Sequence, residues 1–376
     1  MKFLFLVNDV MSPGSGIGKK IISQCDAVKP LVNEFYFAST DNSFEFRNVN
    51  GVKLFEGDLL LRRWLFRYCF SSLFDFVKLK SIDVVYIRYT HFSSPSFIVF
   101  TQKLKSIGVK IIIEVPTYPY DYEYKKLGLT SNLKLLIDKF YRKRLSKYID
   151  KCVTFTAVED DIFGIDTLQI SNAVSADNVK SNIVAIEQST TLTLKVINFV
   201  CVASLHSWHG YDRLILSLSS YTKLSRYTPI HVYIVGDGPE LNSLKKLVAT
   251  LQLNSFVTFC GELQGDDLRK QILLANIGID SLGRHRVGNE SNNSLKSKEY
   301  LSFGLPVVKS HKDYSLETLD CVYDVSADEQ NFDIEKIILW YKINDFMTKK
   351  IEIANICLEK YTWETQMKTV LKSLKC

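Results

Sequence analysis

The chain has 376 residues, of which 46% are hydrophobic and 23% charged, with a formal net charge of +6. This composition is typical of a soluble globular protein, and the length is too great for one ordinary core, so two domains are expected. Apolar runs stay below the roughly 18 residues that a membrane span requires, so none is predicted. The eight cysteines are scattered and form no CxxC pair, which argues against a zinc site or a disulfide framework and favours free thiols.

The first ten residues, MKFLFLVNDV, form a short apolar run that soon meets acid and turn residues. We therefore expect a first strand over residues 2–8 and not a signal peptide. Glycines 14, 16 and 18 follow, before a helix predicted over residues 17–28. Their spacing matches neither a Walker loop nor G-x-G-x-x-G. The turn at Gly16 either brings a ligand close to the backbone or is a plain tight turn.

Short β-branched or aromatic runs predict strands at residues 33–38, 83–88 and 109–115, with helices at 58–79 and 92–106. Alternating strands and helices indicate a parallel, doubly wound sheet, whose ligands bind at the carboxyl ends of the strands. The segment EVPTYPYD (114–121) leaves such an end. It either offers side chains to a sugar or is only a loop stiffened by two prolines; the candidate residues are Glu114, Thr117, Tyr118 and Tyr120.

Two stretches interleave basic and aromatic residues, at residues 61–70 and 134–151. A basic, aromatic helix face suits an anionic membrane surface. Equally, it is the solvated face of a core helix. A nucleic-acid partner is not expected, because the basic residues are confined to these stretches and no base-stacking motif accompanies them.

Strands are expected next at residues 152–157 and 168–171, followed by a polar, weakly periodic stretch at 175–195 that we interpret as a linker. A second sheet is predicted from strands at 196–203, 231–235, 256–261 and 276–281, and a helical tail from residue 328. The domains expected are residues 1–185, 186–350, and a final segment, 351–376.

The stretch at residues 284–308 carries the most specific signal. Ser294 is a predicted N-cap for a helix over 295–303, which Gly304 and Pro306 end before a buried strand. Lys296 and Glu299 are three residues apart, on one face near the helix N-terminus. The free amides, the helix dipole and the lysine at this end favour the binding of a phosphate, and the glutamate can accept hydrogen bonds from a ribose. The alternative is a surface helix with a Lys–Glu pair.

The segment EYLSFGLPVV (299–308) resembles the E-A-x-A-x-G-x-P-V-V element of the retaining glycosyltransferases of family 4, and SLKSKEY (294–300) is similar to the variant in bacterial capsule and O-antigen enzymes. The family's first glutamate, eight residues before Glu299, is replaced by Ser291 beside Glu290. EVPTYPYD resembles the same subgroup, without the histidine usual in the family. The resemblance implies a GT-B fold: two Rossmann-like doubly wound domains facing across a cleft, and a last helix crossing back to the first.

The segment SLHSWHGYDRLI (204–215) is similar to the family's donor-binding element, with Ser204 and His209 in place of an arginine and a lysine that hold the diphosphate. A protonated His209 could supply part of the missing charge. Arg284 and Arg286 either supply the rest or are unpaired surface arginines. VGDGPE (235–240), with Gly236 and Gly238, resembles the family's V-x-G-x-G-P-E element, which implies a wall near the nucleotide. The loop that contains Gly16 is comparable to the family's glycine-rich first loop.

The resemblance implies transfer of a sugar, with retention, from a nucleotide-diphosphate donor to an acceptor that we expect to be a lipid-linked oligosaccharide. Lys296, Arg286 and the amides of Ser294 and Leu295 would stabilise the leaving diphosphate, and Glu299 would hold the ribose. No cofactor is expected, and no metal, because D-x-D is absent and Asp121-x-Glu123 is the nearest match. The expected location is the cytoplasm, including the membrane's inner face. The alternatives are a nucleotide-sugar epimerase of the same fold and a non-catalytic relative that binds sugar nucleotides.

Overall fold

Parallel strands alternate with helices through both halves of the chain, in a computed structural model that describes residues 1–12, 15–41, 46–55, 69–90, 93–121, 129–156, 160–188, 196–288 and 290–374. The described residues form two compact units. Unit 1 comprises Met1–Ser171 and Trp363–Cys376, and unit 2 comprises Asn172–Thr362. Each unit is built on its own sheet and has its own hydrophobic core.

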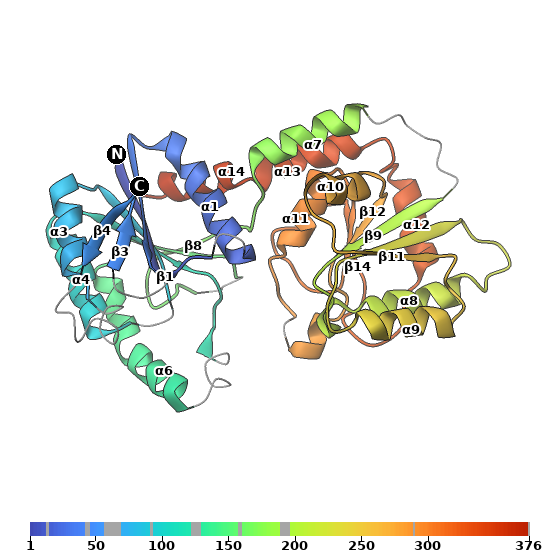
Figure 1. Cartoon of the computed structure of the whole chain (residues 1–376), viewed down its shortest axis with the longest axis horizontal. Coiled ribbons are helices and arrows are strands. Elements are labelled where there is room, and N and C mark those ends of the chain that lie inside the picture. The colour runs from blue at the N-terminus through green and yellow to red at the C-terminus, as the bar shows by residue number, and fades with distance from the viewer. Residues whose placement is uncertain are drawn as a thin grey trace. The chain divides into compact units, whose positions relative to one another are not determined.

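Unit 1 has an eight-stranded sheet in the order β4-β3-β2-β1-β5-β6-β7-β8. Strands β1, β2 and β5 to β8 are parallel, as predicted. Helices α1 and α14 pack together on one face of the sheet, and α3 and α4 pack together on the other (Figure 1). The elements are β1 (Lys2–Val10), α1 (Gly16–Val28), β2 (Glu34–Thr40), β3 (Phe46–Val49), β4 (Val52–Phe55), α3 (Ser71–Lys80), β5 (Val84–Arg88), α4 (Pro95–Ser106), β6 (Lys110–Val115), α6 (Leu129–Arg142), β7 (Lys151–Thr154), β8 (Thr167–Gln169) and α14 (Trp363–Lys372), with 3-10 turns η1 (Lys29–Leu31) and η3 (Lys143–Lys147).

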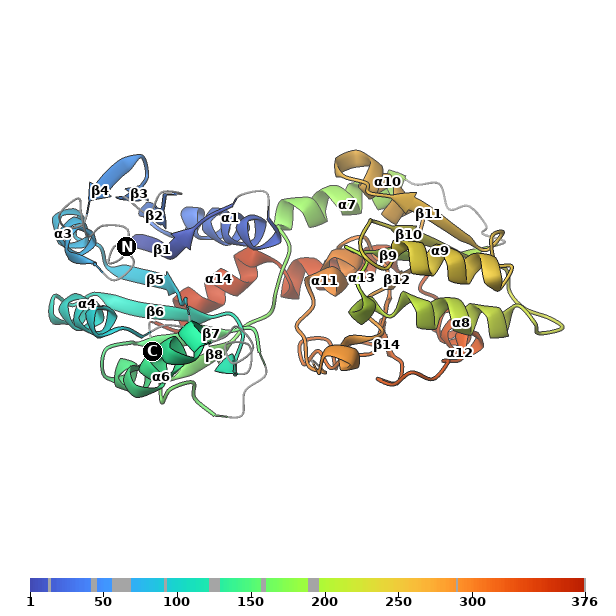
Figure 2. The same ribbon diagram turned by 60° about the horizontal axis from the view of Figure 1, so that its bottom comes forward.

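Unit 2 has a six-stranded parallel sheet in the order β11-β10-β9-β12-β13-β14. Helices α8 and α9 lie along one face, and α7, α11 and α13 pack together on the other (Figure 2). The elements are α7 (Ala176–Gln188), β9 (Ile197–Val202), η4 (Ser207–His209), α8 (Tyr211–Tyr221), β10 (Ile230–Val235), α9 (Leu241–Thr250), β11 (Val257–Gly261), α10 (Gly265–Leu273), β12 (Ile277–Ile279), η5 (Arg284–Val287), α11 (Leu295–Ser302), β13 (Val307–Lys309), β14 (Val322–Asp324), α12 (Ile334–Ile343) and α13 (Lys350–Lys360).

The structure divides the chain earlier than the sequence suggested, at Ser171 and not near residue 185. The stretch interpreted as a linker contains helix α7, which buries Val179, Asn182 and Ile186 at helical spacing. Asn182 is polar, and its amide donates to the Ser302 hydroxyl at 3.1 Å. The buried face of α7 therefore does not show a continuous apolar periodicity in the sequence. Residues 189–195 lie outside the described residues.

The final segment also begins later than predicted, since α13 belongs to unit 2 and only the chain from Trp363 returns to unit 1. Trp363 is buried there, with its ring centroid 6.1 Å from that of Phe155. The antiparallel hairpin of β3 and β4 was not predicted, although its turn carries a familiar signal. Asn50 and Gly51 both have positive φ, as a tight hairpin turn requires. The helix expected over 58–79 is described only from Ser71, because residues 56–68 lie outside the described part of the chain.

Candidate functional site

Helix α11 is held against the second sheet by Tyr300, whose side chain lies beneath strands β9 and β12. The Tyr300 hydroxyl accepts from the Val202 amide at 2.8 Å and donates to the Ile279 carbonyl at 3.3 Å. Gly278 makes room for the ring, because a Cβ on Gly278 would lie 2.4 Å from it. The helix N-terminus therefore lies beside the carboxyl end of β12, where a doubly wound sheet places its ligands.

The predicted helix ends are confirmed as backbone features, but the capping hydrogen bond is not. Ser294 is the N-cap residue and Gly304 has the positive φ of a helix-ending glycine. The Ser294 hydroxyl hydrogen-bonds the Asp280 carboxylate and does not cap a first-turn amide. The Ser294 amide donates to Asp313 at 3.0 Å, so this amide, which we expected to face the diphosphate, is already used.

Lys296 is the cation at this helix tip, and its contacts are long. Its ammonium nitrogen lies 3.5 Å from a carboxylate oxygen of Asp280, 3.5 Å from the Tyr211 hydroxyl and 3.5 Å from the Ser281 hydroxyl. Hydrogen bonds to an ammonium are strong near 2.8 Å and weak at this distance. The side chain is 16% exposed. Lys296 therefore keeps donor capacity for an oxygen that approaches more closely.

Asp280 is the buried acid beneath Lys296. Burial alone would raise the pKa of Asp280. The positive charge of Lys296 lowers it, as do the electrostatic effect of His311 and hydrogen bonds from the Ser294 and Ser297 side chains, so the pKa lies well below its ordinary value. Burial lowers the pKa of Lys296, and the charge of Asp280 opposes that change. The charge of Asp280 thus favours the protonated form of Lys296 at the end of β12.

His209 lies near Lys296 and Asp280, but it is not a cation at neutral pH. Burial lowers its pKa to about 3, with a further contribution from the charge of Lys296. Its ring stacks on Tyr211, with the centroids 5.6 Å apart. The suggestion that a protonated His209 replaces the family's lysine is therefore wrong, since the imidazole is neutral above pH 5. Ser204 is exposed on the loop after β9.

The two arginines after β12 have different environments. Arg284 is half-buried, burial lowers its pKa, and its buried Nε has no hydrogen-bond partner. Arg286 instead donates to both carboxylate oxygens of Asp212 at 2.9 and 2.7 Å and to both of Glu329 at 2.8 and 2.6 Å. It also donates to the Ser207 carbonyl at 2.8 Å. These bonds use all the donors of Arg286, which argues against the catalytic role expected for it, whereas the Nε of Arg284 has no partner.

Gly236 and Gly238 serve the packing of two loops. A Cβ on Gly236 would lie 1.9 Å from the Ala203 carbonyl oxygen, and one on Gly238 would lie 2.5 Å from the Leu205 amide. The Leu205 amide donates to the Asp237 carbonyl at 2.7 Å. The glycines therefore bring the loop after β10 against the loop after β9.

The remaining donor-side residues lie where a ligand can reach them. Glu299 is exposed on α11, one turn after Lys296, and Leu295 is half-buried at the first position of that helix. In unit 1, Gly16 is exposed at the start of α1, where the Ser15 hydroxyl accepts from the Gly18 amide at 3.0 Å. A Cβ on Gly16 would have nothing within 4 Å of it, so packing does not require glycine there.

Glu114 of unit 1 is a buried structural acid. It accepts from Gln24 at 2.7 Å and from the Tyr86 hydroxyl at 2.7 Å, and it pairs with Arg88. Burial would raise its pKa, but Arg88, Lys20 and these hydrogen bonds lower it. With no exposed surface, Glu114 does not meet an acceptor directly, contrary to our expectation.

The residues of the loop after β6 that were predicted to contact the acceptor differ in their exposure. Tyr120 is buried, and its hydroxyl donates to Asp138 at 2.6 Å, so it holds the loop in place and is not exposed to a ligand. Thr117 is exposed and Tyr118 is partly exposed, beside a cis bond to Pro119. Of the predicted acceptor residues, Thr117 and Tyr118 therefore remain available.

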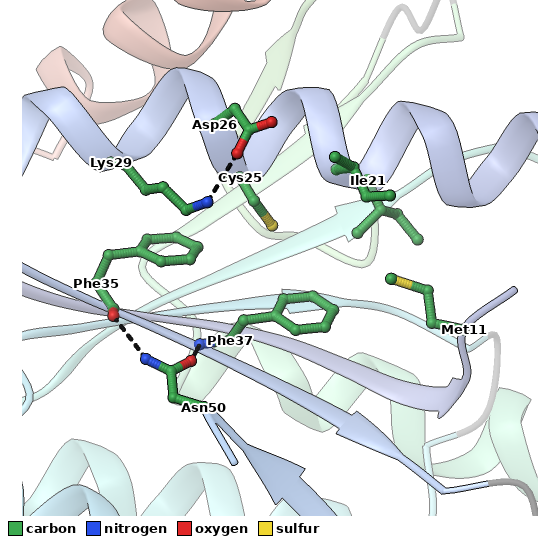
Figure 3. Close-up of a pocket in the computed structure, with 9 residues that line it drawn as sticks. Met11, Ile21, Cys25, Asp26, Lys29, Phe35, Phe37 and Asn50 are labelled. Atoms are coloured by element: carbon green, nitrogen blue, oxygen red, sulfur yellow. Dashed lines mark hydrogen bonds and ion pairs between the residues drawn. The ribbon is translucent and has the colours of Figure 1, made fainter. Parts of the chain in front are cut away.

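A pocket of about 410 Å³ lies in unit 1 between α1 and β2, away from these residues (Figure 3). On the helix side of the pocket Lys29 pairs with Asp26 at 2.7 Å, and on the sheet side Asn50 is bonded to the backbone of Phe35 and Phe37. Its polar groups are thus already paired with one another. The lining residues are Met11, Ile21, Ile22, Cys25, Asp26, Lys29, Phe35, Phe37 and Asn50.

Within the described ranges, no group of three His, Cys, Asp or Glu side chains is placed to hold a metal ion. None of the helices described is both long and apolar enough to pass through a bilayer.

Sequence reasoning missed Asp280, Tyr211 and the buried pair of Lys298 and Asp313, whose charged atoms are 2.6 Å apart. The signal for Asp280 was present, since an acid directly after a buried strand of a doubly wound sheet lies at the ligand-binding edge. Lys298 carried no such signal, because its spacing from Lys296 does not reveal which of the two lysines faces inward.

Residues 197–320 match the family model described as "Glycosyl transferases group 1". No curated protein matches the sequence. Among solved structures, a glycosyltransferase from Rickettsia africae ESF-5 is 14% identical over 100% of this chain and 97% of its own, with a TM-score of 0.64. Anabaena HepE in complex with UDP is 15% identical over 100% of both chains, with a TM-score of 0.64. WaaG, a glycosyltransferase involved in lipopolysaccharide biosynthesis, is 12% identical over 99% of both, with a TM-score of 0.58.

These findings agree with the architecture described above. The two parallel-sheet units and the solved structures define the GT-B fold. The matched family model covers the strands and loops that surround Lys296, from β9 to the residues after β13. The chain is therefore a glycosyltransferase of the GT-B fold.

Proposed function

We propose that the chain is a retaining glycosyltransferase of the family 4 type, which moves a sugar from a nucleotide-diphosphate donor to a lipid-linked saccharide in the cytoplasm during synthesis of a surface polysaccharide. The observation that carries the proposal is the tip of α11, where Lys296 has three contacts of 3.5 Å and the neighbouring Arg284 has a buried Nε without a partner. These are two cations, inside a glycosyltransferase group 1 domain, with donor capacity left over.

The chemistry follows from where the negative charge develops. As the bond between the anomeric carbon and the diphosphate oxygen breaks, its electron pair stays on the diphosphate. Fixed cations stabilise that charge without reorganisation. Lys296 is held by Asp280, Arg284 lies on the adjacent loop, and Glu299 is one turn away for the ribose hydroxyls. HepE has been solved with UDP and with UDP-glucose, which supports a nucleotide sugar as the donor here.

The acceptor and pathway rest on different support. The resemblance of residues 294–308 to capsule and O-antigen enzymes favours a saccharide of the bacterial surface. WaaG and the lipopolysaccharide outer core galactosyltransferase WaaB share the fold, which is consistent with this. Thr117 and Tyr118, on the exposed part of the loop after β6, are the residues proposed to contact the acceptor.

Lys296→Ala tests the role of the helix tip. Loss of one such electrostatic donor lowers turnover by roughly 10²-fold or more. Lys270→Ala is the matched control, because that lysine is exposed on α10 and pairs only weakly, at 3.6 Å, with Asp267. Release of nucleotide from a panel of nucleotide sugars would be measured for both variants. Transfer by Lys296→Ala at the wild-type rate would contradict the assigned role.

A second candidate is a non-catalytic relative that binds the sugar nucleotide. It is favoured by one observation: Ser204 and a neutral His209 stand where the family has two cations. The same assay separates the two. Donor hydrolysis or sugar transfer would exclude the binding-only candidate, whereas thermal stabilisation by UDP-glucose without any turnover would favour it.

A further inference from the structure

Trp208 of η4 has surroundings unlike those of the other tryptophans in the described ranges. Trp363 is buried, and Trp340 packs against the core of unit 2 and donates its indole N–H to the Asp320 carbonyl at 3.1 Å. Trp208 is partly exposed and does not belong to that core, and the described residues provide no hydrogen-bond acceptor for its indole N–H. Tryptophans of folded proteins usually pack in a core and find a partner for the N–H, so core packing does not explain Trp208.

The neighbouring His206 holds this indole in one orientation. The two rings are stacked, with their centroids 4.1 Å apart and an angle of 9° between their planes. Their loop is fixed to the segment after β12, because Arg286 donates to the Ser207 carbonyl at 2.8 Å and the Leu282 amide donates to the His209 carbonyl at 2.8 Å. An aromatic surface that is already ordered loses little conformational freedom when a ligand binds to it.

A series of ring contacts leads from Lys296 to Trp208. The Lys296 ammonium nitrogen lies 5.8 Å from the centroid of the Tyr211 ring, and that centroid is 5.6 Å from the centroid of His209. The His209 centroid is in turn 5.9 Å from that of Trp208. The series leaves α11 and ends in η4, whereas Glu299 lies on α11 itself, one turn after Lys296. Two different groups therefore lie near the cation: a carboxylate on α11 and an aromatic surface on η4.

We propose that Trp208 contacts the transferred sugar of the donor, whose pyranose ring lies against the indole. This inference rests on the proposed function, in which Lys296 binds the diphosphate and Glu299 binds the ribose. Because the diphosphate joins the ribose to the sugar, a ribose at Glu299 leaves the sugar on the side of η4. The C–H groups on one face of a pyranose are apolar and match the face of an indole, and a sugar hydroxyl can accept from the indole N–H.

Calorimetric titration of the full-length protein with UDP and GDP, and with UDP-glucose, UDP-N-acetylglucosamine and GDP-mannose, tests the proposal. The nucleotide sugar that the wild type binds most tightly is compared with its own nucleoside diphosphate. Trp208→Ala should weaken binding of that nucleotide sugar by roughly tenfold, because the aromatic surface is lost, and should change binding of the diphosphate by less than about twofold. Trp208→Phe keeps an aromatic face and should lose about threefold or less. Trp340→Phe is the matched control and should bind both ligands as the wild type does.

Tryptophan fluorescence gives a second readout, which a purely structural role of Trp208 would not affect. The nucleotide sugar should change the emission of the wild type more than the nucleoside diphosphate does. This difference should vanish in Trp208→Phe, because the other three tryptophans remain in that variant and are not proposed to meet the sugar. The readout therefore depends on the position of one indole and does not require the loss of any side chain that supports the loop.

Three results would overturn the inference. One is equal weakening of the nucleotide sugar and of the nucleoside diphosphate by Trp208→Ala, because Trp208 would then serve the nucleotide or the loop. The second is a fluorescence difference that persists in Trp208→Phe, and the third is a variant whose only change is a higher KM for the acceptor. In each case the proposed function stands. A wild type that binds none of these ligands would overturn the proposed function, and the inference about Trp208 with it.

Discussion

Each sheet has a buried acid and a cation at the carboxyl end of a central strand, and the two pairs differ in how completely they are satisfied. In unit 1, Glu114 has hydrogen bonds of 2.7 Å from Gln24 and Tyr86 in addition to Arg88. In unit 2, Asp280 is well satisfied, by the Ser297 hydroxyl and the Ser281 amide at 2.6 Å, but Lys296 lies 3.5 Å from each of its partners.

The difference indicates what each pair is for. A buried ion pair with a full set of hydrogen bonds holds elements together, and breaking it leaves an uncompensated charge. A buried cation with only long contacts is incompletely solvated, which a phosphate can correct. Similar chemistry at equivalent ends of two similar sheets is therefore structural in unit 1 and, on our proposal, ligand-binding in unit 2.

Arg88→Met tests the structural role of the buried pair in unit 1, and its expected effect is the largest. Removing one partner of a buried pair costs about 3–5 kcal/mol, because Glu114 would be left buried without its cation. The measurement is the free energy of unfolding of unit 1 in urea. Lys110→Met is the control, since Lys110 is exposed and pairs with Asp150 at 3.3 Å, so it should cost less than about 1 kcal/mol. Equal effects of the two variants would mean that Arg88 is not a structural partner.

Arg286→Gln, compared with Lys296→Ala, tests which cation meets the diphosphate. Arg286 is engaged by Asp212 and Glu329, so its loss should change the dissociation constant for UDP by less than about threefold, although the ion pairs contribute up to about 1 kcal/mol each to stability. Lys296→Ala should raise that constant by roughly tenfold or more. Calorimetric titration with UDP gives both values. A larger loss from Arg286→Gln would restore the role that the contacts argue against.

The neutral state of His209 predicts a pH dependence of stability. Its pKa is about 3 in the folded chain and near 6.5 when unfolded, so the unfolded state binds more protons between these values. The contribution of His209 is therefore complete above pH 6.5 and falls as the pH is lowered, by about 2 kcal/mol at pH 5.

Thermal unfolding at pH 7 and pH 5 measures this, with His209→Gln as the comparison. The variant should lose correspondingly less stability than the wild type on acidification. Identical losses in the two proteins would show that His209 titrates normally. In Lys296→Ala, the pKa of His209 should rise, because the neighbouring positive charge is one cause of the depression.

Glu299→Gln tests whether the two ends of the nucleotide are bound by different residues. Glu299→Gln should weaken UDP binding by up to roughly tenfold, because it replaces a charged acceptor of the ribose hydroxyls by a neutral amide oxygen, which accepts a weaker hydrogen bond. Binding of inorganic pyrophosphate should be unchanged, since that ligand has no ribose. Weakened binding of both ligands would assign Glu299 to the helix tip as a whole and not to the sugar.

The sequence by itself was sufficient for the alternation of strands and helices, the two parallel sheets and the helix that places Lys296 at its tip. These features depend on local spacing: apolar runs of strand length, a glycine and a proline that end α11, and two residues three apart on one helical face. Where the buried face of a helix includes a polar residue, as at Asn182 in α7, local spacing did not predict the helix.

Which charged side chains remain available to a ligand depends on contacts that the folded chain alone brings about. Arg284 and Arg286 are two residues apart in sequence, yet Arg286 is surrounded by Asp212 and Glu329, from elements far away along the chain. Lys296 and Lys298 are likewise alike in sequence, but Lys298 is fully buried against Asp313. Pairing depends on distances between residues that the fold brings together, and burial sets whether a group such as His209 carries charge. Neither quantity is contained in local sequence spacing.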